Sequence, residues 1–100
     1  MGHGVSRYIL SRRAERHLQH IFEYGIEQFG ERQAAAYSTQ LTNCFQLLAE
    51  NPRMGRLSPS IRPGLRRHEH SSHVIIYREE KNRVLIVAVL HKRQMLALKL

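Results

Sequence analysis

Three histidines, His68, His70 and His73, lie close together in the segment 66–77, directly after two arginines. Imidazole side chains bind zinc, act as general acids or bases, or form part of a basic surface. Taken as one strand, the segment places His68 and His70 on one face and His73 on the other. A structural zinc site needs four ligands, and the only cysteine, Cys44, lies far away in the sequence. We therefore expect no metal and no cofactor, and we interpret the histidines as basic surface residues.

A second chemistry open to these residue types is cleavage of RNA without a metal. It needs a base near the 2′-hydroxyl, an acid at the leaving oxygen and cations that stabilise the developing charge. His73 or His91 would act as base or acid, and Tyr77 would position the substrate. The candidate cations are Arg67, Arg78 and Arg93. Any basic domain of this size offers a similar set, and arginines on the outside of a sheet with a packed Tyr77 would explain the same residues.

The elements that would position these side chains begin with a helical hairpin. Apolar residues recur at intervals of three and four over residues 14–29 and again over 34–48, which is the spacing of an apolar stripe on a helix. Ser11 is a suitable N-cap for the first helix, and Gly30 suits the left-handed position that ends it. Pro52 ends the second helix. The pattern predicts two antiparallel helices joined by a short turn.

Short β-prone runs flank that hairpin. They lie at residues 7–10, 65–70, 73–78 and 83–90, and a turn-rich connector precedes the last three. Glu80-Lys81-Asn82 predicts a hairpin turn between the last two runs. In the final run, both alternating sets of side chains are apolar: Val84, Ile86, Ala88 and Leu90, and Leu85, Val87 and Val89. This is typical of a central strand that is covered on both faces, or of one that a partner chain covers on one side.

The predicted order is β-α-α-β-β-β, an α+β fold with a helical hairpin packed on a small, mostly antiparallel sheet. We expect a single domain over residues 1–100, because a chain of this length has room for one modest core. Within it, the hairpin covers about 12–50, the sheet about 65–90, and a basic tail 91–100. That tail would form a short helix or stay mobile until it is bound.

The net charge of +8 is unevenly distributed. Residues 1–50 contain 5 arginines and 5 glutamates, whereas residues 51–100 contain 11 lysines and arginines against 3 glutamates. The second half therefore carries the whole excess, which indicates an anionic partner such as nucleic acid or an acidic protein segment. Glycine-rich phosphate loops and the G-x-S-x-G motif are absent from the sequence, so the signatures of nucleotide binding and serine hydrolysis are missing.

Hydropathy and cysteine content indicate the compartment. The longest unbroken apolar run, Val84 to Leu90, has 7 residues, and a membrane helix needs about 20. The first residues lack the apolar stretch of a secretory signal, and a lone cysteine agrees with reducing conditions. We expect a cytoplasmic protein that does not bind a membrane.

Several short motifs resemble those of the RelE/ParE toxin superfamily, ParE branch. They are Ser11–Glu15 with Leu18, Ile21 and Tyr24, then Phe29-Gly30, Asn51–Arg56, Arg62–Arg66, His73–Arg78 and Val89–Gln94. Each motif alone has low specificity, but together they follow the order and spacing of that superfamily over roughly residues 6–95. The resemblance implies the fold described above, and a role as the toxin of a type II toxin–antitoxin system in a bacterium.

Within the ParE branch, the resemblance implies a toxin that binds DNA gyrase without catalysing a reaction, and that a cognate antitoxin neutralises. The RelE branch implies the alternative of an endonuclease that cleaves messenger RNA in the ribosome, with His91 near a catalytic position. The tail lacks a tyrosine and the connector lacks lysines, which departs from that branch. A third possibility is a basic DNA-binding module that uses the arginines of the first helix, although Glu15, Glu23 and Glu27 dilute its charge.

The resemblance and the charge distribution together predict two contact surfaces. We expect the target to be bound by Arg78, His91, Lys92, Arg93, Gln94 and Met95. We expect the antitoxin to contact Leu18, Tyr24, Tyr37, Arg66, Arg67 and Arg83. The antitoxin should be acidic and partly disordered, should form a hetero-oligomer with this chain, and should mediate any contact with operator DNA.

Overall fold

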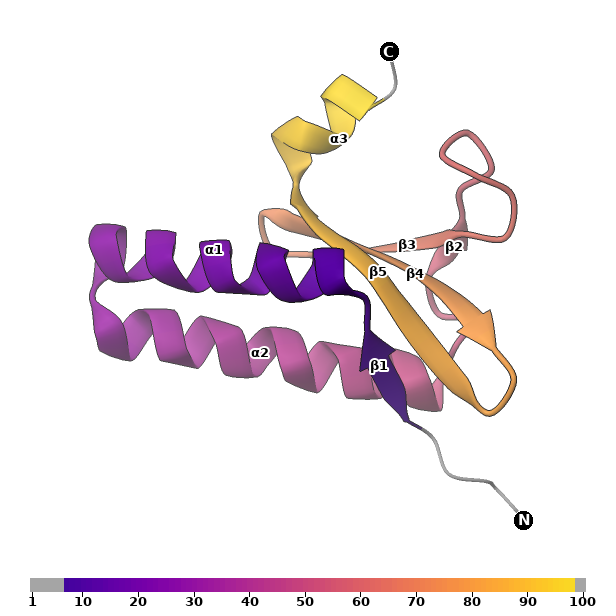
Figure 1. Ribbon diagram of the computed structural model, residues 1–100, viewed down its shortest axis with the longest axis horizontal. Coiled ribbons are helices and arrows are strands. Elements are labelled where there is room, and N and C mark those ends of the chain that lie inside the picture. Colours follow the sequence, from indigo (N-terminus) through magenta and orange to yellow (C-terminus); the bar gives the residue numbers. More distant parts are fainter. Residues whose placement is uncertain (1–6, 99–100) are drawn as a thin grey trace.

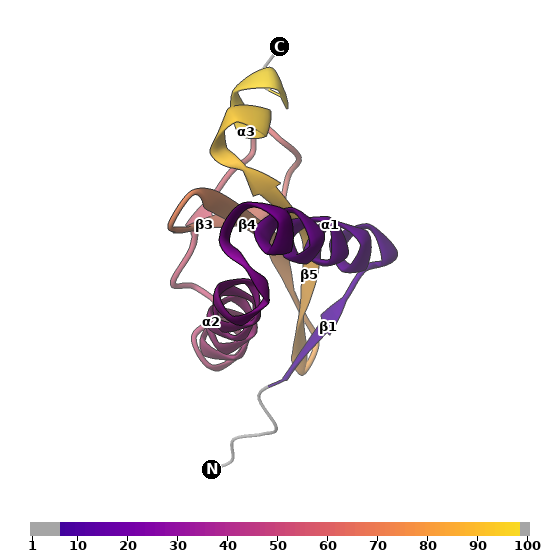
Figure 2. The ribbon, with the colours of Figure 1, turned by 90° about the vertical axis from the view of Figure 1, so that its left-hand side faces the viewer.

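A computed structural model of the chain describes residues 7–98, with side chains from 7 to 95. The elements in chain order are β1 (Tyr8–Leu10), α1 (Arg12–Phe29), α2 (Glu31–Glu50), β2 (Arg56–Leu57), β3 (Arg66–His70), β4 (His73–Glu80), β5 (Arg83–His91) and α3 (Lys92–Leu98). The two long helices lie side by side and pack on the sheet, while α3 projects beyond the end of β5 (Figures 1 and 2). The predicted α+β fold is confirmed.

The sheet has five strands in the order β1-β5-β4-β3-β2. β1 runs parallel to β5 and pairs Tyr8 with Val84, whereas the other neighbouring strands are antiparallel. The first strand of the chain therefore lies beside the last. The two-residue strand β2, inside the connector, was not predicted, because a run as short as Arg56-Leu57 carries no detectable periodicity.

Both ends of α1 are defined by the residues expected there. The Ser11 hydroxyl accepts a hydrogen bond from the Ala14 amide at 3.0 Å and donates one to the Val87 carbonyl at 2.7 Å. It therefore caps the helix and ties it to β5. Gly30 has φ 91° and ψ 162°, so its φ is positive as expected, but its ψ is extended and not left-handed helical. This single residue ends α1 and begins α2.

The main core lies between the helical hairpin and the sheet. Its largest fully buried side chains are Tyr77, Phe45, Leu41, Leu48, Ile75, Ile86, Val84 and Val89. Cys44 of α2 is a buried member of this cluster. Burial raises the pKa of the Cys44 thiol, so the protonated, unreactive form is favoured.

An irregularity in β5 changes which of its side chains face the helices. Ile76 of β4 pairs with Ala88, but Tyr77 pairs with Ile86, so Val87 is an extra residue in β5. As a result Val84, Ile86 and Val89 all contribute to the core under the helices, whereas Ala88 belongs to the opposite side. The simple alternation predicted for residues 83–90 was wrong beyond Ile86.

A smaller core lies on the other face of the sheet. It contains Leu65, Val74, Ile76, Ala88 and Met95, and Ile61 and Leu90 pack against it. Met95 comes from α3, so this short helix covers part of the sheet, and the tail takes the first of the two forms predicted for it. Among the helices within residues 7–98, none is both long and apolar enough to span a membrane.

Candidate functional site

Three histidines and a tyrosine meet where the β3–β4 turn approaches α2. We call Tyr37, His70, His73 and His91 the histidine corner. The Tyr37 ring lies 5.5 Å from the His73 ring and 5.8 Å from the His70 ring, and the His73 and His91 rings are 5.5 Å apart, measured between centroids. The Tyr37 hydroxyl oxygen is 2.6 Å from His73 Nδ1. Side chains from α2, β3, β4 and β5 therefore form one connected cluster.

This arrangement corrects the face assigned to His73. The segment is not one strand but a tight hairpin, in which His70 pairs directly with His73 across Ser71 and Ser72. Directly paired residues share a face, so His68, His70 and His73 all point toward the helices. The positive φ of Ser71, 54°, shows where the chain reverses. The two serines were not recognised as a turn because they lack the glycine or asparagine that usually marks one.

Burial keeps the His73 imidazole of the histidine corner largely uncharged at neutral pH. Burial, together with the neighbouring His91 and His70, lowers the pKa of His73 from 6.5 to about 4. Burial also lowers the pKa of His68, with a further contribution from His70. Within residues 7–98, no three His, Cys, Asp or Glu side chains are grouped so that they would hold a metal ion. The corner is thus suited to packing and hydrogen bonding.

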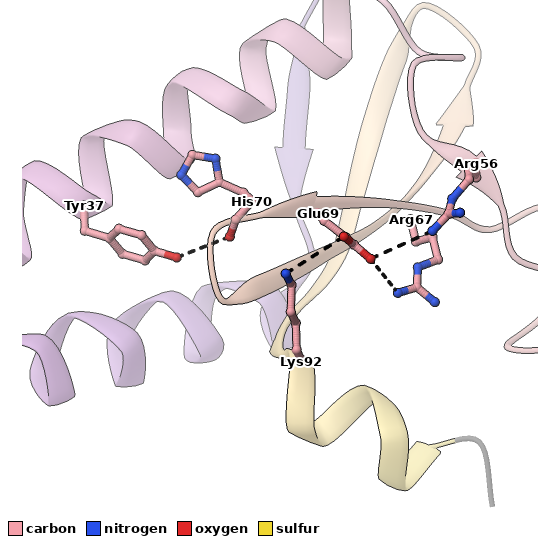
Figure 3. Close-up of polar contacts among 6 residues, drawn as sticks. All are labelled: Tyr37, Arg56, Arg67, Glu69, His70 and Lys92. Atoms are coloured by element: carbon pink, nitrogen blue, oxygen red, sulfur yellow. Dashed lines mark hydrogen bonds and ion pairs between the residues drawn. The ribbon is translucent and has the colours of Figure 1, made fainter.

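A cluster of cations occupies the opposite face of β3. We call Arg56, Arg67, Glu69 and Lys92 the Glu69 cluster. Glu69 Oε2 lies 3.2 Å from Arg67 Nη2 and 3.9 Å from Arg56 Nη2, and its Oε1 lies 3.9 Å from Lys92 Nζ. Figure 3 shows these three cations around one carboxylate, while the neighbouring His70 points to the other side, toward α2. β2, β3 and α3 each contribute to the cluster.

The side chains proposed for RNA cleavage do not share a surface. His73 and His91 lie on the helix side, whereas Arg67 lies on the α3 side with the Glu69 cluster. Tyr77 is fully buried, and its hydroxyl donates to the Pro52 carbonyl and accepts from the Gly55 amide, both at 2.8 Å. These contacts leave Tyr77 without access to a substrate. Arg93, at the start of α3, is exposed.

Arg78 lies further from that chemistry than the sequence suggested. It is near the β4–β5 turn and forms an ion pair of 2.9 Å with Glu80. Five residues of strand separate it from His73, a distance of roughly 17 Å. The six candidates taken together therefore do not form a catalytic constellation in this structure.

The connector is anchored by residues that sequence reasoning missed. The Tyr77 hydroxyl holds Pro52 and Gly55, and Arg66 Nη1 donates to the Gly55 carbonyl at 2.8 Å. Burial raises the pKa of Tyr77, which keeps its hydroxyl protonated as a donor. No periodic pattern would have revealed these contacts. Glu69 was also missed, although a lone glutamate within the basic segment 51–78 was a usable signal.

The sequence and the fold of the chain are similar to those of known proteins. The sequence profile of a family described as "ParE toxin of type II toxin-antitoxin system, parDE" matches residues 8–96. The chain belongs to the ParE toxin family. The match extends from β1 into α3 and so includes every residue of the histidine corner and of the Glu69 cluster.

Individual ParE proteins are similar over nearly the same span. Toxin ParE1 of Mycobacterium tuberculosis is 38% identical over 89 residues, which cover 88% of this chain and 91% of that protein. Toxin ParE1 of Caulobacter vibrioides is 41% identical over 85 residues, covering 85% and 88%. A solved structure described as a chromosomal ParDE TA system from P. aeruginosa superposes with a TM-score of 0.74 at 20% identity, covering 90% of this chain and 98% of that one. It shares the fold.

The target contacts predicted for this ParE chain gather mostly at the β5–α3 junction. His91, Lys92, Arg93 and Gln94 form a compact turn, in which the His91 amide donates to Gln94 Oε1 at 2.8 Å and the Arg93 amide donates to His91 Nδ1 at 3.1 Å. Met95 differs, because its side chain is only 3% exposed and packs in the smaller core. In this conformation it is not available to a partner. Arg78 lies apart, as described above.

The antitoxin contacts predicted for this ParE chain are spread over several faces. Tyr24 is 61% exposed on α1, whereas Leu18 and Tyr37 are half-buried against the main core. Arg66 and Arg67, as neighbours in β3, point to opposite faces of the sheet. Arg83 lies at the β4–β5 turn, 2.9 Å from Glu80. An antitoxin that touched all six residues would have to wrap around the domain.

Proposed function

We propose that this chain is the toxic component of a type II toxin–antitoxin pair, that it inhibits DNA gyrase by direct binding, and that it does so without catalysing a reaction. The family match over residues 8–96 carries this proposal. The dispersal of the nuclease candidates supports binding over catalysis, because acid–base cleavage requires acid, base and cations within reach of one phosphate. The basic turn at the β5–α3 junction is the surface that we assign to the target.

We further propose that a cognate antitoxin neutralises the chain in a hetero-oligomer. An excess of 8 positive charges, all in the second half, would attract an acidic segment and speed its association. The structurally similar ParDE protein is described as part of a TA system, which supports the same arrangement here. Operator DNA would then be reached through the antitoxin. Gyrase acts in the bacterial cytoplasm, where we expect this chain to reside.

The decisive experiment adds purified chain to DNA gyrase with relaxed plasmid. We expect loss of supercoiling and an increase in linear DNA once toxin and gyrase are equimolar. The double variant Lys92→Gln/Arg93→Gln should lose most of that effect, whereas Arg12→Gln/Arg13→Gln, with the same change of net charge on α1, should keep it. Unaltered supercoiling at a large molar excess of folded toxin would exclude gyrase as the target.

Two further assays test the remaining parts of the proposal. Co-expression with the product of the adjacent reading frame should yield a complex and restore supercoiling, and the chain alone should not shift operator DNA. In a translating extract, messenger RNA should remain intact when the chain is added. Messages that are cut when the wild-type chain is added, but not when the His91→Ala variant is added, would instead support the ribonuclease.

A further inference from the structure

We propose that the Glu69 cluster is a carboxylate-binding site for an acidic peptide segment, and that Glu69 occupies this site in the free chain. The inference rests on the proposed function in one respect, because the segment would belong to the antitoxin. The cluster lies on the face that carries α3, away from the helical hairpin (Figure 3).

The charges around Glu69 are more than one carboxylate neutralises. Arg56, Arg67 and Lys92 contribute three positive charges within 4 Å of a single carboxylate, which leaves an excess of two. Both oxygens of Glu69 are used, and the cations approach from three different elements. The side chains of Arg56 and Lys92 are 74% and 50% exposed, so they are free to follow an incoming ligand. A second carboxylate would meet a site already arranged for one.

Arg67 is the anchor of the cluster, and Glu69 does not satisfy it. Its side chain is only 19% exposed, and Glu69 contacts it through Nη2 alone. Among the described residues, nothing accepts a hydrogen bond from the buried Arg67 Nε. A carboxylate that lies in the plane of a guanidinium accepts from both nitrogens, which is the stronger arrangement. A peptide carboxylate that displaces Glu69 can orient itself to accept from two guanidinium nitrogens, whereas Glu69, two positions along the same strand, accepts from Nη2 alone.

The surroundings favour a peptide over a nucleic acid. Proteins that bind single strands usually place aromatic rings beside their cations, so that bases stack on them. Tyr24 and Phe29, the exposed aromatic side chains in the described part of the chain, belong to α1 on the other side of the sheet. The paired register of β2 ends at Arg67, so within residues 7–98 no strand is paired with the outer edge of Glu69. An extended acidic chain would reach the cluster from this side.

The first test measures binding of a fluorescent glutamate octapeptide at low ionic strength, where exposed charges are least screened. We expect Glu69→Gln to bind about fivefold more tightly than wild type, because an exposed ion pair contributes up to about that factor. The matched control is Glu27→Gln on α1, which changes the net charge equally but frees no cation of the cluster. Equal gains in both variants would overturn the proposal, since they would reflect net charge alone.

The second test removes the anchor. Arg67→Gln should bind the octapeptide about tenfold more weakly, as expected for the loss of a charged hydrogen bond, whereas Arg53→Gln should change binding little. Arg53 is 82% exposed and lies near Glu79 instead. If Arg67→Gln unfolds, Lys92→Gln takes its place with a smaller expected loss. Unchanged binding in a folded variant of either kind would overturn the proposal.

A third measurement separates the ligand classes and the two hypotheses. A short DNA duplex should gain no more from Glu69→Gln than from Glu27→Gln, and a gain specific to Glu69→Gln would point to phosphate and overturn the choice of a peptide. Binding of the octapeptide does not depend on gyrase. If the chain does not inhibit gyrase but the octapeptide binds as expected, only the proposed target is rejected. If the chain inhibits gyrase but the octapeptide does not bind as expected, only the carboxylate site is rejected.

Discussion

The hydroxyl oxygen of Tyr37 lies 2.6 Å from Nδ1 of His73, a contact between α2 and β4 at the histidine corner. Its consequence is positional, because it joins the helical hairpin to the β3–β4 turn. The Ser72 carbonyl of the same turn accepts a hydrogen bond from the Lys92 amide at 2.9 Å. One small turn therefore holds both α2 and the start of α3.

Replacing Tyr37 with phenylalanine should weaken that connection. We expect Tyr37→Phe to lower the free energy of unfolding by about 1 kcal/mol, because a partly buried hydrogen bond is lost while the ring is kept. Urea unfolding measures the change. The control is Tyr24→Phe on exposed α1 surface, which should stay within about 0.5 kcal/mol of wild type. Equal midpoints for the two variants would contradict the structural role of the bond.

The low pKa of His73 makes stability depend on pH. The pKa of His73 is 6.5 in the unfolded chain and about 4 in the folded chain. The unfolded state therefore holds more protons between these two pH values. The contribution of His73 to the free energy of unfolding is thus fully present above about pH 6.5 and is lost as the pH falls toward about 4. Burial lowers the pKa of His17 and His68 as well, which acts in the same direction.

For His73 alone we expect a loss of about 1–2 kcal/mol, a value reduced to allow for its partial exposure to solvent. Urea unfolding at about pH 7.5 and about pH 5 measures it. His73→Gln cannot take up the proton and should show a smaller fall between the two conditions. An identical fall in wild type and variant would assign the pH dependence to other groups.

Gly55 has no room for a side chain. A Cβ atom there would lie 2.5 Å from the Tyr77 hydroxyl oxygen and 2.8 Å from the Arg67 carbonyl oxygen. Gly55→Ala should therefore displace the connector and cost about 2 kcal/mol, a fall of roughly 10 °C in melting temperature for a domain of this size. Circular dichroism measures it. A melting temperature equal to that of wild type would show that the connector is not held by Tyr77.

Zinc and nickel should leave the protein unchanged. Three histidines share one face, but they are spaced for ring packing, and the described residues offer no metal-binding group. Titration with either ion at neutral pH should not shift the melting temperature, and neither should a chelator. A rise of several degrees with one equivalent of metal would show that the histidine corner rearranges around an ion.

Much of the fold was predictable because it depends on short-range patterns. The apolar period of three to four residues located both helices, and the Ser11 cap and the Gly30 turn located their ends. The pairing of the N-terminal strand with β5 was not predicted, since no local feature of Tyr8–Leu10 specifies a partner so distant in the chain. The extra residue at Val87 was missed for a related reason, because only the register of β4 reveals it.

The candidate site was harder to predict, because it depends on which faces meet. Once Ser71-Ser72 is recognised as a turn, His70 and His73 fall on one side and Glu69 on the other. His91 and Lys92 are sequence neighbours, yet they serve different clusters on opposite faces. Residue types correctly indicated a basic second half. They did not indicate that three of its cations surround a glutamate.

The parallel pairing of β1 with β5 has a consequence for synthesis. The sheet is complete only when Tyr8 pairs with Val84 and Leu10 with Ile86. The first strand therefore cannot pair until almost the entire chain has been synthesised. At about 5–20 residues per second, translation takes roughly 4–15 s to cover that interval. From the synthesis of Glu50 until that of β5, the helical hairpin lacks the strand that covers its apolar stripe. A partner protein synthesised nearby would encounter the chain before β5 is in place, and thus before the domain is completely folded.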